Sequence, residues 1–237
     1  MDEAEKIAPT NEVVASEAAP EESGDRGRRA LRFARELLET IVLTLVIFLV
    51  VRANITMYRV DGTSMVPTLH DGAYLIVNKT VYFHFNKNAL RNWLPGPDNQ
   101  ERDVAYLFHP PRRGDIVVLN PPVPSDKPYI KRVIGLPGDR ISIHDGKVYV
   151  NDVALTEPYI AAPPAYRYPQ GTENGVYVVP EAHVFVLGDN RNNSQDSHGA
   201  NFGAVSLDSI IGQAFFIYLP LDDAGIIPHH RYSELGE

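Results

Sequence analysis

The chain has 237 residues, with 22 Lys and Arg against 30 Asp and Glu, a formal net charge of -8 and no cysteine. This acidic balance argues against a general nucleic-acid binder. The absence of cysteine excludes disulfide bonds, thiolate catalysis and cysteine metal sites, although it leaves the cellular compartment open.

Residues 1–35 are predicted to be a disordered tail that ends in a basic flank. The first part, 1–25, is rich in Ala, Glu, Pro and Ser and poor in large apolar side chains, which is typical of disorder. Five arginines follow it directly, namely Arg26, Arg28, Arg29, Arg32 and Arg35. We expect this tail to stay in the cytoplasm.

The long hydrophobic run that comes next is predicted to be a transmembrane anchor over 36–56. Its most apolar part, 41–51, is short against the roughly 20 residues of a spanning helix, but apolar neighbours on both sides extend it. A buried core helix and a cleaved signal peptide are the alternatives. Because the five preceding arginines outnumber Arg52 and Arg59, we expect a single-pass protein with an extracytoplasmic body.

Residues 57–220 are predicted to form a mostly β domain built from antiparallel sheets. Short β-branched runs bounded by Gly, Pro or Asp occur at 73–77, 115–119, 129–134, 140–143, 147–150, 175–179, 183–187 and 213–219. Asp145-Gly146 predicts a tight hairpin. No long amphipathic helix separates the runs, which argues against a parallel α/β fold.

The remaining segments carry weaker signals. We expect 83–113 and 157–174 to be long surface excursions, the first without an assigned role, and 221–237 to be a C-terminal tail.

Ser64 lies in a turn between Gly62 and Pro67. Glycine tolerates a positive φ and proline fixes φ and lacks an N–H, so this turn can hold a hydroxyl in one direction. A serine in a turn often bonds only its own backbone, and it acts as a nucleophile only when a base comes from elsewhere in the chain.

Lys131 is the candidate base, since it lies in an apolar strand. Alternation sends Lys131 and Arg132 to opposite faces, so we expect one of the two to point inward. Burial destabilises the ammonium ion and lowers the pKa of a lysine, which makes a neutral amine available near pH 7. A lysine on a solvent-exposed edge strand is the alternative.

A third polar segment, 188–199, follows an apolar strand. It does not fit a calcium loop, because Arg191 stands at the third position, Ser194 replaces the required glycine and Ala200 replaces the bidentate glutamate. A hydrogen-bonded surface loop is the alternative. The histidines form no metal-binding spacing, and we expect no metal and no cofactor.

Four segments in this order resemble the successive boxes of bacterial type I signal peptidases, the leader peptidases with a Ser-Lys dyad: 64–69, 113–118, 131–139 and 188–197. The resemblance covers 60–199 and, with the anchor, reaches back to about residue 37. It implies a serine endopeptidase in the plasma membrane of a bacterium that removes signal peptides from preproteins after small residues at -3 and -1. The implied partners are signal peptides, the lipid bilayer and the protein-export machinery, without nucleic acid.

The same resemblance assigns roles to single residues. It implies that Ser64 is the nucleophile, Lys131 the general base and Ser194 the hydroxyl that orients the lysine amine. Asp189, Arg191 and Asp196 resemble a supporting polar network, and the Ser64 N–H resembles one oxyanion donor.

Three features depart from the family pattern. Gly62 stands where some members carry a serine hydroxyl as a second oxyanion donor. His198 replaces the arginine that usually ends the last box, which leaves the ion pair with its acidic partner open. The short segment between Lys131 and Gly188 implies a reduced second β part.

Two other functions remain open from the sequence alone. One is a related Ser-Lys hydrolase with another substrate, and the other is a catalytically silent, membrane-anchored β module for protein interaction.

Overall fold

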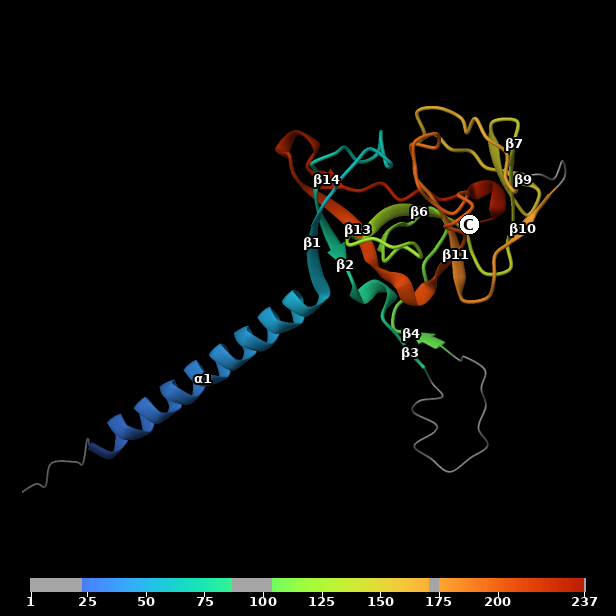
Figure 1. Ribbon diagram of the computed structural model, residues 1–237. Coiled ribbons are helices and arrows are strands. Elements are labelled where there is room, and N and C mark those ends of the chain that lie inside the picture. Colours follow the sequence, from blue (N-terminus) through green and yellow to red (C-terminus); the bar gives the residue numbers. More distant parts are fainter. Residues whose placement is uncertain (1–22, 87–103, 171–174, 237) are drawn as a thin grey trace, which may run out of the picture. The chain divides into compact units, whose positions relative to one another are not determined.

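The computed structural model describes residues 23–86, 104–170 and 175–236 (Figure 1). The chain divides into two compact units, Met1–Leu49 and Val50–Glu237. The tail expected at 1–22 and parts of the two expected excursions, 87–103 and 171–174, lie outside the described residues.

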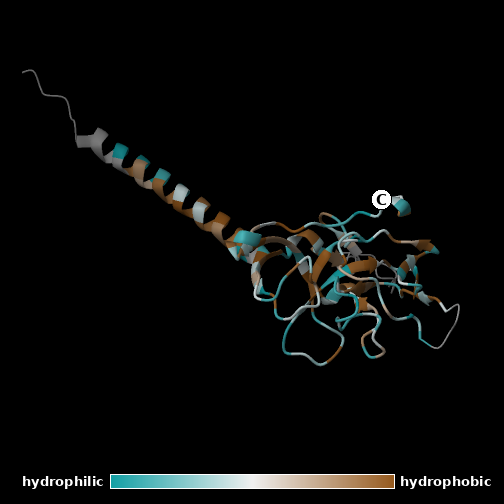
Figure 2. Ribbon diagram, turned by 90° about the horizontal axis from the view of Figure 1, so that it is seen from above, coloured by the Kyte–Doolittle hydropathy of each residue, from teal (hydrophilic) through white to brown (hydrophobic). Residues whose placement is uncertain are grey.

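The N-terminal element is a helix, α1, over Ser23–Asn54. Its first part, 23–35, was expected within the disordered tail but is helical, because its arginine, alanine and leucine residues are good helix formers. The large apolar side chains from Leu37 to Val51 are all at least 50% exposed. Figure 2 shows this half of the helix as mostly hydrophobic.

The anchor predicted over 36–56 extends too far, because α1 ends at Asn54 and strand β1 begins at Ile55. The β-branched residues Ile55 and Thr56 favour the extended backbone. In the described part of the chain, no helix reaches the combination of length and hydropathy that crossing a bilayer requires.

The main sheet has eight strands and is antiparallel throughout, so the prediction of a mostly β, antiparallel body is confirmed. Its order is β1 (Ile55–Arg59), β2 (Tyr74–Asn78), β13 (Ile210–Leu219), β5 (Ile116–Leu119), β6 (Tyr129–Gly135), β11 (His183–Leu187) and β12 (Val205–Ser206), and β14 (Gly225–Ile226) pairs with β13. Each run predicted as a strand overlaps an observed one.

A smaller sheet of four strands lies between Lys131 and Gly188 in the sequence, where a reduced second β part was implied. Its order is β10 (Tyr177–Val178), β7 (Arg140–His144), β8 (Lys147–Val150) and β9 (Val153–Ala154). The predicted hairpin joins β7 to β8, and its residues Asp145 and Gly146 have φ values of 52° and 73°. Both central residues of a type I′ turn need positive φ, which explains this dipeptide.

The other elements are short. A third sheet pairs β3 (His84–Asn86) with β4 (Val104–Tyr106), so part of the expected 83–113 excursion is a two-stranded ribbon. Four 3-10 helices complete the described elements: η1 (Thr80–Tyr82), η2 (Leu207–Ser209), η3 (Leu221–Asp223) and η4 (Ser233–Leu235).

The expected C-terminal tail, 221–237, is instead part of the β domain. Ile227 and Tyr232 are almost completely buried, each in a different hydrophobic cluster. At Gly114 an added Cβ would lie 1.8 Å from the His230 carbonyl oxygen, so only glycine allows this close backbone approach. The tail prediction was wrong because its few apolar residues find partners that are distant in sequence.

Candidate active site

The turn that carries Ser64 is held from both sides of the serine. Gly62 has a φ of 100°, as predicted for this position, and its N–H donates to Asp71 Oδ1 at 2.7 Å. Met65 and Leu69 are fully buried in the cluster beneath β1, β2 and β13. Because the neighbours of Ser64 are fixed, its hydroxyl has little freedom to move away from the body of the domain.

The polar loop 188–199 clamps the same turn. The Asn190 N–H donates to the Ser64 carbonyl oxygen at 3.0 Å, and Asn190 Nδ2 donates to the Thr63 carbonyl oxygen at 3.0 Å. Asn193 Nδ2 donates to Thr63 Oγ1 at 3.1 Å. The sequence analysis did not single out these two asparagines. The high density of polar residues directly after an apolar strand was the feature that could have indicated them.

Lys131 lies on β6, which has β5 on one side and β11 on the other. Its burial is confirmed, with only 3% of its surface exposed. The expectation that just one of Lys131 and Arg132 points inward was wrong, because Arg132 is also fully buried. Alternation still sends the two side chains to opposite faces, but packed residues cover both faces of this central strand.

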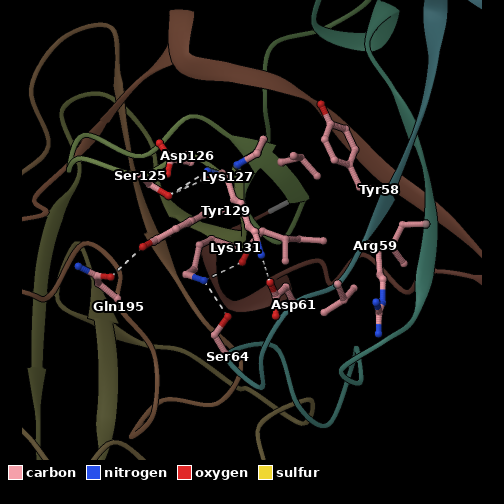
Figure 3. A pocket seen from close by; sticks show the side chains of 15 residues that line it. Tyr58, Arg59, Asp61, Ser64, Ser125, Asp126, Lys127, Tyr129, Lys131 and Gln195 are labelled. Atoms are coloured by element: carbon pink, nitrogen blue, oxygen red, sulfur yellow. Dashed lines mark hydrogen bonds and ion pairs between the residues drawn. The ribbon is translucent and has the colours of Figure 1, made fainter.

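The Lys131 amine lies within hydrogen-bond distance of the Ser64 hydroxyl. Nζ of Lys131 lies 2.8 Å from Ser64 Oγ and 2.9 Å from the carbonyl oxygen of Ile130 (Figure 3). Burial lowers the pKa of Lys131 to about 8, while the carboxylates of Asp196 and Asp189 act in the opposite direction. A substantial share of the amine is therefore neutral just above neutral pH, and a neutral amine can take a proton from the hydroxyl.

Ser64 and Lys131 line one cleft of about 560 Å³. Residues 58–61, at and after the end of β1, form one side, and residues 125–131 form another (Figure 3). The Tyr129 ring centre is 5.3 Å from Lys131 Nζ, and its hydroxyl donates to Gln195 Oε1 at 2.9 Å. The cleft is thus open to a chain segment while the amine itself stays shielded.

Asp189 connects β6 to the serine turn. Its carboxylate accepts two bonds from Arg132, at 2.8 and 2.7 Å, and a third from Thr68 Oγ1. Both charged side chains are fully buried. The Arg132 guanidinium also donates to the Gly114 carbonyl oxygen and lies 4.0 Å from the Tyr159 ring centre.

Arg191 and Asp196 have other partners. The buried Arg191 guanidinium pairs with Glu157, with Nη2 2.6 Å from Oε1. Asp196, also buried, accepts the Gly188 N–H at 2.8 Å and lies 2.6 Å from Nδ1 of His198. The three predicted support residues therefore form separate pairs around the loop.

Sequence reasoning missed two partners in these pairs. Glu157 and Tyr159 come from a segment expected to be a surface excursion, yet the Glu157 side chain is nearly buried and the Tyr159 ring centre lies 4.0 and 5.8 Å from the guanidinium groups of Arg132 and Arg191. Neither stands in a local pattern that indicates an ion pair.

Ser194 is placed beside the serine turn. An added Cβ at Gly188 would lie 2.3 Å from Ser194 Oγ and 2.4 Å from the Ser64 carbonyl oxygen, so glycine is needed where these groups meet. Within the described ranges, the buried Ser194 Oγ has no hydrogen-bond partner. Its contact with the lysine amine therefore stays a prediction.

Among the described residues, no group of three or more His, Asp or Glu side chains could hold a metal ion. The chemistry available in the cleft is that of a hydroxyl, a desolvated amine and the backbone N–H groups of a tight turn.

Comparison with known proteins points to one family. The family model described as signal peptidase, peptidase S26, matches residues 34–219. A probable signal peptidase I-2 of Synechocystis sp. is 35% identical over 85% of this chain and 81% of its own length. Signal peptidase I of Leptolyngbya laminosa is 36% identical over 80% and 82%, and signal peptidase I T of Bacillus subtilis is 33% identical over 78% and 85%.

Proposed function

Because the chain belongs to the signal peptidase family, peptidase S26, and is a serine endopeptidase, we propose that it cleaves signal peptides from exported preproteins with a Ser64–Lys131 dyad. The observation that carries the dyad is the 2.8 Å distance between Lys131 Nζ and Ser64 Oγ. The lowered pKa of Lys131 supports its role as the base, since only the neutral amine accepts a proton.

In the proposed reaction, Ser64 Oγ attacks the scissile carbonyl carbon while its proton passes to Lys131 Nζ. The negative charge on the carbonyl oxygen is stabilised by backbone N–H groups of the turn, with the Ser64 N–H as one donor. The lysine then gives the proton to the leaving amine, and in the second half it activates the water that hydrolyses the acyl-enzyme.

Substrate choice follows from the walls of the cleft. Leu75, Val118 and Ile130 supply aliphatic surface, and the Tyr129 ring stands close to the amine. Such walls suit small side chains, in line with cleavage after small residues at -3 and -1 of the preprotein.

We further propose that α1 anchors the protein in the plasma membrane of a bacterium, with the β domain outside and the export machinery nearby. The exposed apolar side chains from Leu37 to Val51 support this attachment, because so much apolar surface is unfavourable in water. An anchor holds the cleft near membrane-bound signal peptides and so raises their effective concentration.

The cleavage rate is expected to rise with pH through a midpoint near pH 8 and to level off above it. The pKa of Lys131 is lowered to about 8 by burial, so the competent neutral amine is lost as the pH falls below this value. The measurement is kcat/KM against pH on one peptide with an Ala-x-Ala site. An acidic limb near pH 10, the value of a solvated lysine, would show that Lys131 is not the base.

Ser194→Ala belongs to the same pH series. If the hydroxyl only orients the amine, this variant should lower the rate by roughly a hundredfold and leave the acidic limb where it is. A rate equal to that of the wild type would remove Ser194 from the site.

The topology is tested by adding protease to spheroplasts. From the excess of arginines before residue 41, we expect digestion of the β domain and protection of the N-terminal tail. Protease added after lysis, which should digest both, is the control. Protection of the β domain in intact spheroplasts would contradict the proposal, and a mature N-terminus near Asn54 would show that the helix is a cleaved signal.

A further inference from the structure

Gln195 is an exposed side chain on the wall of the cleft that carries the dyad. The next two residues, Asp196 and Ser197, are fully buried. Asp196 accepts the Gly188 N–H at 2.8 Å, just after the end of β11. Ser197 Oγ accepts the Val186 N–H within β11 at 2.9 Å. The backbone beside Gln195 is therefore fixed to the main sheet, while the Gln195 side chain reaches into the cleft.

The Tyr129 hydroxyl sets the orientation of the Gln195 amide. This hydroxyl donates to Gln195 Oε1 at 2.9 Å, and the Tyr129 ring is itself held by stacking on Phe202, with ring centres 6.0 Å apart. A carboxamide carries its acceptor oxygen on one side and two N–H donors on the other. Because the oxygen faces Tyr129, Nε2 points away from it, and in the described part of the chain Nε2 has no hydrogen-bond partner. Two oriented donors are thus available to a bound chain.

Gln195 lies at the end of the cleft opposite Arg59, with Ser64 and Lys131 between the two (Figure 3). The ring centre of Tyr129, the partner of Gln195, is 5.3 Å from Lys131 Nζ. In the proposed reaction this amine protonates the leaving nitrogen, so the chain that follows the scissile bond passes close to the amine. Gln195 is therefore on the leaving side of the cleft, where the mature protein begins.

We propose that Gln195 is a specificity-determining residue for the start of the mature protein, where its amide donates to a hydrogen-bond acceptor such as a carboxylate side chain. This inference rests on the proposed cleavage of preproteins, because that reaction decides on which side of the dyad the leaving chain lies. Side chains of an extended chain alternate in direction, so only one of the positions +1 and +2 should face Gln195. At that position the enzyme should favour Asp over Leu, which has a similar size and no acceptor.

The test measures selectivity in the full chain, as the ratio of kcat/KM for two peptides that share an Ala-x-Ala site. One series carries Asp or Leu at +1, and a second series carries them at +2. Gln195→Met keeps the size of the side chain but has no donor, so we expect it to lower the Asp/Leu ratio by about fivefold in one series. A ratio cancels any loss that affects both peptides equally. Wild-type ratios in both series of this variant would overturn the proposal.

Three further variants separate the amide donors from the rest of the cleft. Gln195→Glu keeps an oxygen for the Tyr129 hydroxyl and replaces the free donors by a carboxylate, so the Asp/Leu ratio should fall below that of Gln195→Met. Tyr129→Phe keeps the ring but releases the amide, and should lower the ratio by about twofold. Ser125→Ala, in the same cleft, is the control and should leave the ratio unchanged. An unchanged ratio in Gln195→Glu would contradict the proposal.

A second measurement needs no catalysis. The Kd values of the same Asp and Leu peptides, labelled with a fluorophore, are measured by anisotropy on full-length Ser64→Ala and on Ser64→Ala/Gln195→Met. The first should bind the Asp peptide of one series more tightly than its Leu partner, and the second should lose about fivefold of this preference. The same preference in both proteins would overturn the proposal. If the preference disappears as expected but Ser64→Ala cleaves like the wild type, the dyad is rejected and the role of Gln195 stands.

Discussion

Replacing Ser64 or Lys131 with alanine is expected to lower the rate of preprotein cleavage by about a thousandfold or more. Ser64→Ala removes the attacking oxygen, and Lys131→Ala removes the amine 2.8 Å from it. Neither change should unfold the domain, because Ser64 is only partly buried and Lys131 leaves behind no unpaired buried charge. The two losses should not add in the double variant, since both residues serve one step.

The cleft itself offers matched controls. Ser125 and Lys127 line the same cleft, but Ser125 Oγ bonds the Lys127 carbonyl oxygen and Lys127 pairs with Asp61. Ser125→Ala and Lys127→Ala should therefore retain most of the activity on the same peptide. Circular dichroism of every variant checks the fold. Wild-type turnover by either dyad variant would reject the mechanism, whereas absence of cleavage by the wild type itself would favour a silent interaction module.

Arg132→Met is expected to lower the free energy of unfolding by about 3–5 kcal/mol. Arg132 and Asp189 are both fully buried and joined by two hydrogen bonds, so removing the guanidinium leaves a carboxylate without a counter-charge in the interior. The double variant Arg132→Met/Asp189→Leu should recover part of this loss, because no buried charge remains.

Urea unfolding of the purified chain measures these differences. Arg140→Met is the control, since its pair with Asp152 is solvent-exposed at 3.5 Å and such pairs contribute about 0–1 kcal/mol. A loss below about 1 kcal/mol in Arg132→Met would show that the pair is hydrated. If the double variant were as unstable as the single one, packing of the arginine stem would explain the loss.

The pairing of Lys131 with Ser64 depends on the support of the loop 188–199. Asn190 and Asn193 donate hydrogen bonds to the turn that carries Ser64. Gly188 lets the loop backbone approach this turn closely, and Asp189 pairs with Arg132 on β6. A misplacement of about 1 Å between two catalytic atoms can cost roughly a hundredfold in rate, so this frame contributes to the activity of the dyad.

The local elements follow from the amino-acid sequence alone. Strands such as β7 and β8 and the hairpin at Asp145-Gly146 follow from β-branched runs and from the need for positive φ, which are properties of neighbouring residues. The order of the four motif segments indicated the family, and the turn around Ser64 was recognisable from Gly62 and Pro67.

Which side chains are buried together depends on the folded arrangement of the whole domain. A strand pattern cannot tell that both Lys131 and Arg132 lie in the interior, because that depends on β5 and β11 flanking β6 and on what covers the two faces. Glu157 pairs with Arg191, and Tyr232 lies buried at the end of the chain, through contacts between residues distant in sequence. Burial and electrostatic shifts are sums over such distant neighbours, so the depressed pKa of Lys131 becomes definite only once the chain has folded.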